Sequence, residues 1–359
     1  MIKNVKISNY QLGMLIMGFL FGSSAVMNPT IQVAQDAWLA YIFGLVQGLA
    51  LIWIYVKLSL LNQGQSLIEI LKTHFGKYLG TMVSLLYIWY FVHLAALVLR
   101  NYGEHMTVTV FFDTPEVFTM GCFALLVGYC LRSGLEVTAR AAEMLMPYLF
   151  LFVLAIFLLL AREYDMQNIF PILENGLAPV IKVSYSLLTF PFGEMVAFLM
   201  IFPALSSYKS LKKVTLLSSL LMGLILLGIT LRDLLSLGPD LLVRLVFPPS
   251  LSTELIPELQ LEPLISVNLL LGGWIKITIC LYAAALGIVQ LLNINEYKVL
   301  SFPLCFLCVA LAIWLYDDVF QMLDWAFKIY PFYVLPMQII IPILLLVISI
   351  VKNLRADKA

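Results

Sequence analysis

Ten apolar runs divide this chain, and they constrain its fold more than any other feature. Each run has about 17 to 25 residues, which is long enough for an α-helix to cross the hydrocarbon core of a bilayer. The composition agrees, because 62% of the residues are hydrophobic and only 12% are charged. The sequence therefore predicts an all-α integral membrane protein, with a single membrane domain over residues 1–359 and no soluble domain. The predicted spans are residues 10–28, 37–60, 79–101, 114–132, 141–162, 183–206, 214–236, 264–291, 300–316 and 331–352.

The basic residues predict the orientation of these spans. With the N-terminus inside, about two thirds of the 21 Lys and Arg fall in inner segments, as the positive-inside rule requires. Both termini are then cytoplasmic. The segment Ser66 to Gly80 alternates Leu and Ile with charged residues at helical spacing, so we expect an amphipathic helix on the inner surface. We interpret the acidic residues between spans 7 and 8 as charges of a solvated outer loop; they are Asp233, Asp240, Glu254, Glu258 and Glu262.

Two spans carry helix-breaking residues near their middle. In span 1 these are Gly22 to Ser24, followed by Pro29, and in span 6 they are Pro191 to Glu194. Paired interruptions in two halves are typical of transporters that are built from inverted repeats with discontinuous helices. We therefore expect a first five-helix repeat over residues 10–162 and a second, inverted repeat over residues 183–352, with helices 1 and 6 broken.

The breaks indicate a cavity, because non-helical backbone at membrane depth is tolerated only where it lines a cavity or is buried in protein. Free amides at a half-helix N-terminus can bind a carboxylate, and free carbonyls can bind a cation. Glu194 is a buried ionisable residue, which is usually functional. It is a candidate to face the amine of a ligand or to take up a proton. The alternative is that it only caps freed amides or pairs with a neighbour.

Further candidates lie in spans 3 and 8. Lys276 is an intramembrane charge with no counter-ion nearby in the sequence, so Glu194 is its obvious partner. Lys276 is also a candidate for ion or proton coupling, although it could instead snorkel toward a water-filled vestibule. Tyr90 and His93 are candidate lining residues within an aromatic face that can equally be packing. The candidate ligand-binding residues are Gly22, Ser23, Ser24, Phe192, Gly193, Glu194, Tyr90 and His93.

Six segments resemble one known family over nearly the whole chain. They are FGSSAVMNP, SLIEILKTHFGKYLG, RSGLEVTARAAEMLMP, FPFGEMVAFLMIFP, GGWIKITICLYAAALGIVQLL and YPFYVLPMQIIIPILLL. Together and in this order they resemble the GerAB-like spore germination permeases, the B subunits of spore germinant receptors, within the amino acid-polyamine-organocation transporter superfamily.

The resemblance implies a LeuT-like fold that senses a small nutrient germinant, such as an amino acid, at the two breaks. It also implies germinant receptor A and C subunits as partners, and the spore inner membrane or cell membrane of an endospore-forming bacterium as the location. One position departs from the superfamily pattern, because Ser24 stands where a second glycine is usual. A side chain there limits the approach of a ligand carboxylate to the backbone.

A proton- or cation-coupled transporter of amino acids or amines is the competing hypothesis, since a sensor derived from a transporter keeps the same cavity. An enzyme is not expected, because the chain has no P-loop, H-E-x-x-H or G-x-S-x-G motif and only three His. We expect no cofactor, no metal site and no nucleic-acid partner. A channel is not favoured either, since no ring of charge or filter-like run is visible.

Overall fold

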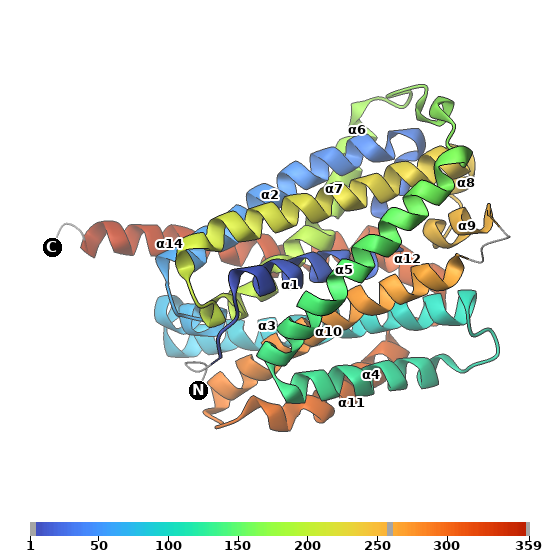
Figure 1. The fold of residues 1–359 in the computed structure, drawn as a ribbon. Coiled ribbons are helices and arrows are strands. Elements are labelled where there is room, and N and C mark those ends of the chain that lie inside the picture. Colours follow the sequence, from blue (N-terminus) through green and yellow to red (C-terminus); the bar gives the residue numbers. More distant parts are fainter. Residues whose placement is uncertain (1–4, 257–260, 357–359) are drawn as a thin grey trace.

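A computed structural model describes residues 5–256 and 261–356, and within these ranges the chain is a bundle of α-helices (Figure 1). Nine of the described helical segments are long and apolar enough to cross a membrane. The first predicted span would be a tenth such segment, but its helix, α1, is shorter because it ends at the break. The long helices are α1 Asn9–Phe21, α2 Ala37–Leu61, α3 Leu67–Thr109, α4 Glu116–Ser133, α5 Leu135–Leu159, α6 Leu177–Leu187, α7 Leu211–Leu237, α10 Glu262–Leu292, α11 Ser301–Leu315 and α14 Ile341–Ala356. The short ones are α8 Pro239–Leu242, α9 Pro248–Glu254, α12 Val319–Asp324 and α13 Tyr330–Tyr333.

The predicted surface helix and span 3 form one element. Helix α3 is 43 residues long and contains both, with a kink at Gly76, whose φ is 78°. Glycine tolerates this left-handed backbone because it has no Cβ. The helix starts at a capping box in which Ser66 and Glu69 exchange side-chain and backbone hydrogen bonds, an arrangement that satisfies two free amides.

Both predicted breaks are present, which confirms that helices 1 and 6 are discontinuous. Helix α1 ends at Phe21 and is followed by a 3₁₀ turn, Gly22–Ala25, and by a second 3₁₀ segment, Pro29–Asp36. Helix α6 ends at Leu187 and passes through a π-helical turn, Leu188–Phe192, into 3₁₀ geometry. Both broken segments lie in the interior of the bundle, where their freed backbone groups can find protein partners.

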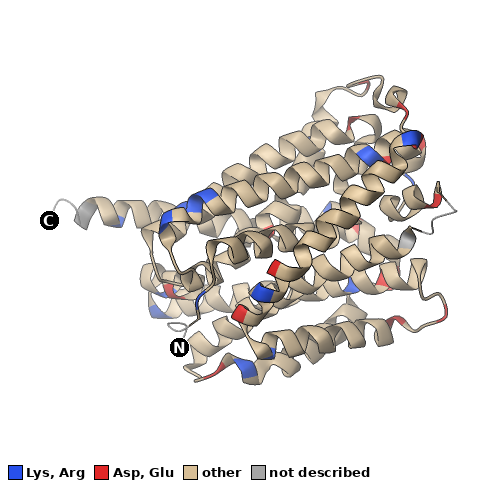
Figure 2. Cartoon of the chain, in the orientation of Figure 1, with Lys and Arg blue, Asp and Glu red and all other residues tan. Residues whose placement is uncertain are grey.

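The central layer of the bundle is made by α1, α3 and α10. Helix α10 packs along α3 and crosses α1, while α7 covers α1 and α2 on the other side (Figure 1). The beginning of α1 and the end of α14 lie at the same end of the bundle (Figure 1). Most charged residues lie toward the two ends of the bundle (Figure 2), which leaves an apolar middle for the bilayer.

One interpretation from the sequence is wrong. Asp233 is not a solvated loop charge, since it lies in the last turns of α7 and is 4% exposed. Arg232, 2% exposed, pairs with it at 2.6 Å, and the Ser252 hydroxyl donates to the same oxygen at 3.0 Å. The segment after α7 folds back over the helix end and buries the pair, which chain order alone does not reveal. Glu258 lies outside the described residues.

Candidate functional site

The site is organised around a buried ion pair. Lys276 Nζ on α10 lies 2.5 Å from Glu194 Oε2 in the second break, and the two side chains are 0% and 1% exposed. This confirms the expected partner of Lys276. The ammonium also lies over two aromatic rings, 4.8 Å from the centroid of Phe190 and 5.5 Å from that of Phe19, where cation–π attraction adds to the pairing. Opposite charges at this distance neutralise each other in the interior.

The second carboxylate oxygen of Glu194 is also occupied. Tyr330 Oη donates to Glu194 Oε1 at 2.6 Å. Gln338 lies behind Tyr330 and donates from Nε2 to Tyr90 Oη at 2.8 Å. These contacts join the second break to the last span. Tyr330 and Gln338 were missed by sequence reasoning, although a glutamine inside the apolar segment YPFYVLPMQIII was a usable signal.

Hydroxyl groups satisfy the irregular backbone around this network. Tyr55 Oη on α2 lies 2.6 Å from the carbonyl oxygen of Gln338 and 3.0 Å from that of Gly193, so its single proton is shared between them. Tyr87 Oη on α3 donates to Met337 O at 2.6 Å. Gln338 and Met337 lie in a π-helical turn, Pro336–Ile340. A Cβ at position 193 would meet the amide end of the Gln338 side chain, so a larger residue there would have to displace it.

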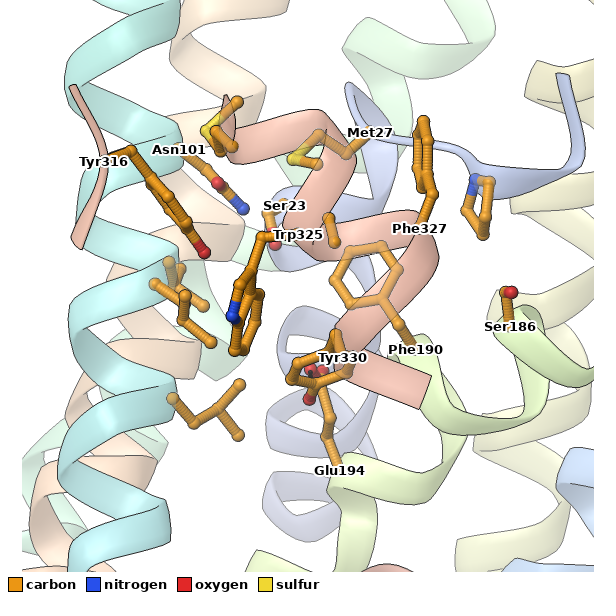
Figure 3. Close-up of a pocket in the computed structure, with 16 residues that line it drawn as sticks. Ser23, Met27, Asn101, Ser186, Phe190, Glu194, Tyr316, Trp325, Phe327 and Tyr330 are labelled. Atoms are coloured by element: carbon orange, nitrogen blue, oxygen red, sulfur yellow. Dashed lines mark hydrogen bonds between the residues drawn. The ribbon is translucent and has the colours of Figure 1, made fainter. Parts of the chain in front are cut away.

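A cavity with about 490 Å³ of free space lies against this pair. Figure 3 shows Glu194 and Tyr330 at one end of it and Asn101 and Tyr316 at the other. Apolar and aromatic side chains make most of the wall, with a few polar groups, which is the usual character of small-molecule sites. The lining residues come from the first break, α3, the second break and the segment from Tyr316 to Tyr330.

The first break contributes only part of its predicted residues to this cavity. Ser23 lines the cavity, and its buried Oγ has no hydrogen-bond partner among the described residues. Ser24 instead lines a separate, smaller cavity beside α7 and Asp233. Gly22 is covered by α10, because a Cβ there would lie 2.5 Å from Lys276 Cδ. The helix therefore turns Gly22 and Ser24 away from the space that Ser23 faces.

Of the predicted residues in the second break only Glu194 lines the cavity, and neither Tyr90 nor His93 of α3 does. Phe192 is fully buried against α2, where a Cβ at Gly48 would meet its ring. Phe190, which was not predicted, lines the cavity instead. His93 stacks on Trp89 with ring centroids 5.6 Å apart and meets Trp325 edge-on. Since Trp325 lines the cavity, His93 lies one side chain behind the wall.

The residues around this cavity limit the chemistry that it could support. Among the described residues, no group of three or more His, Cys, Asp and Glu could hold a metal ion. Glu194 is the only Asp, Glu, Lys, Arg or His among the described residues that line the cavity. An apolar space with a few fixed polar groups can hold and orient a small molecule.

The arrangement of the helices and the two broken spans define a helical membrane protein with a LeuT-like fold. The structure is similar to that of a Na⁺-coupled sialic acid symporter in a substrate-bound, outward-open state, with a TM-score of 0.67 and 12% identity over 97% of this chain and 89% of that chain. It is also similar to MhsT in complex with L-phenylalanine, with a TM-score of 0.61 and 14% identity over 95% of this chain and 97% of that one. At these identities the likeness shows the fold alone.

Sequence comparison gives the family. The profile described as "Spore germination protein" matches residues 6–321, so the chain belongs to the spore germination permease family. It is 30% identical over 365 aligned positions to Spore germination protein KB of Bacillus subtilis (strain 168), which covers 99% of this chain and 98% of that protein. The chain is thus a germination-related membrane permease.

Proposed function

We propose that this chain is the nutrient-sensing membrane subunit of a spore germinant receptor, and that it binds a small nutrient in the cavity between the broken helices. The observation that carries the proposal is the cavity itself, which ends on Glu194 and Tyr330 at the second break and is lined by Ser23 from the first. Family membership supports the germination role, and the fold neighbours whose titles name a bound small molecule support binding at such a place.

A sensor needs a part that moves when the nutrient binds. Here the cavity is covered by α12, α13 and the π-helical turn Trp325–Ile329 between them. We expect this cover to shift when a nutrient enters, because its residues form one side of the cavity. A ligand that binds better when the cover has shifted favours that conformation, and the shift can be passed to receptor A and C subunits in the spore inner membrane. In this proposal both termini face the cytoplasm and residues 10–162 and 183–352 are inverted repeats.

The second candidate function is a proton- or cation-coupled transporter. It is favoured by the fold neighbour whose title describes a Na⁺-coupled symporter. The ion pair argues against cation coupling, because the Lys276 ammonium already holds a fixed positive charge against Glu194. A site that supplies its own cation has less need to take one from solution.

Binding and uptake, measured side by side in liposomes with labelled amino acids, nucleosides and sugars, separate the two functions. Saturable binding without time-dependent uptake is the expected result. Glu194→Gln should abolish binding, since it leaves the buried Lys276 without a counter-ion at the cavity wall itself, which Glu194 forms. Asp233→Asn is the matched control, because it makes the same chemical change at the other buried pair and should retain binding. Sustained uptake driven by a pH or sodium gradient would contradict the sensor and establish the transporter.

A further inference from the structure

Glu194, the charged residue in the cavity wall, already has a partner for each of its carboxylate oxygens. One oxygen of Glu194 faces the Lys276 ammonium at 2.5 Å, and the other accepts the Tyr330 hydroxyl at 2.6 Å. An amine-bearing ligand would have to displace Lys276. That ammonium is fully buried, so displacement would leave a positive charge without a counter-ion, which is strongly unfavourable.

The backbone at the breaks has no free amide at either glycine. The N–H of Gly22 donates to Gly18 O, and the N–H of Gly193 donates to Leu188 O. Gly22 is in addition covered by α10, where a Cβ at Gly272 would lie 2.8 Å from Gly22 N. A ligand carboxylate therefore finds neither glycine amide available, and the described cavity wall includes no Lys, Arg or His.

The polar groups that do face the cavity are uncharged. Ser23 Oγ is buried and lacks a partner among the described residues, which is costly unless something fills the place. Asn101 and the rings of Tyr316 and Trp325 also line the space. These groups can hydrogen-bond to hydroxyl or amide groups and stack on an apolar face, but they cannot compensate a formal charge.

From these three observations we infer that the ligand of this cavity is an uncharged small molecule with hydroxyl or amide groups, and not an amine, a carboxylate or a zwitterionic α-amino acid. The inference rests on the proposed function and narrows it to a ligand class. It also reverses the expectation that Glu194 meets a ligand amine, because the internal lysine takes that place.

Equilibrium binding to the full chain in lipid nanodiscs tests this inference with two sets of labelled probes. The members of the charged set share a 3-methylbutyl group and are L-leucine, 3-methylbutylamine and 4-methylpentanoate. The uncharged set contains 4-methylpentanamide, which has the same group, together with monosaccharides and nucleosides. We expect saturable binding from at least one uncharged probe and no binding or competition from the charged set.

Two serine variants link the binding to this cavity. Ser23→Ala should lower the affinity for the uncharged probe about two- to tenfold, since one neutral hydrogen bond is lost. Ser24→Ala should change the affinity less than twofold, because Ser24 faces the separate, smaller cavity beside α7. A different result would be saturable binding of leucine, the amine or the carboxylate, with an affinity that Ser23→Ala lowers. That result would contradict the inference that the ligand is uncharged, but it would leave the proposed function standing. Binding of no probe from either set by folded protein would contradict the proposed function and this inference together.

Discussion

Two buried ion pairs in this protein have similar chemistry and different surroundings. Glu194 and Lys276 come from different spans, meet at the second break, and have a cavity on one side. Arg232 and Asp233 are neighbours on α7 and lie against Ser252 and the Phe157 ring, whose centroid is 5.8 Å from the guanidinium carbon, and two smaller cavities border them. Each carboxylate has one cationic partner and one hydroxyl partner. The comparison teaches that burial and pairing alone do not mark a ligand site, since only the first pair borders the large cavity between the two breaks.

The largest expected effect is that of Lys276→Met. Removing one partner of a buried pair typically costs about 3 to 5 kcal/mol, and here it also exposes the cavity to an uncompensated carboxylate. We expect a large loss of stability together with loss of ligand binding, measured by unfolding and by equilibrium binding in nanodiscs. The double variant Glu194→Gln with Lys276→Met should recover most of the stability, because no charge is left unpaired. Failure of the double variant to recover would mean that the two residues act independently.

Arg232→Met should destabilise the protein by about 3 kcal/mol for the same reason, because it leaves the buried Asp233 without its cationic partner. It should leave ligand affinity within about twofold once the protein is folded, since Arg232 does not line the large cavity. The measurement is the same pair of assays. A tenfold loss of affinity in a folded Arg232→Met protein would show that the two ion pairs are coupled and would end the distinction drawn above.

The smallest expected effect is that of removing the hydroxyl group that donates to each carboxylate. Tyr330→Phe and Ser252→Ala each remove one hydrogen bond to a charged group, which is worth about 1.5 to 3 kcal/mol, and both should lower the melting temperature. Only Tyr330→Phe should also lower the affinity for the ligand, because Tyr330 lines the cavity and Ser252 does not. Equal effects of the two variants on affinity would assign Tyr330 a purely structural role.

The helices were the most predictable part of the fold. Apolar length predicts a transmembrane helix because lipid offers backbone groups no hydrogen-bond partners, and helices α2, α7 and α10 begin and end within about three residues of the expected spans. The two breaks were predictable for the same reason, since glycine and proline in an apolar run require protein around them. The merging of the surface helix into α3 was not, because the kink depends on the conformation that Gly76 adopts in the folded chain.

The site was predicted less completely than the fold. Glu194 and Lys276 were identifiable because an isolated charge in an apolar span demands a partner. Which of several adjacent residues faces the cavity was not, since that depends on the rotation of irregular backbone. Ser23 and Phe190 face it, while Ser24 and Phe192 pack elsewhere.

The sequence by itself determined that this chain spans a membrane, where its helices break, and that two lone charges inside apolar spans need each other. Those properties depend on hydropathy and on local backbone preference, which are set by residues that are close together in the chain. Only the tertiary structure decided that Lys276 and Tyr330 together saturate Glu194 and that Gln338 lies behind them. Only the tertiary structure, too, showed that Asp233 is buried. These contacts join residues far apart in the chain, and their geometry is set by how the helices pack.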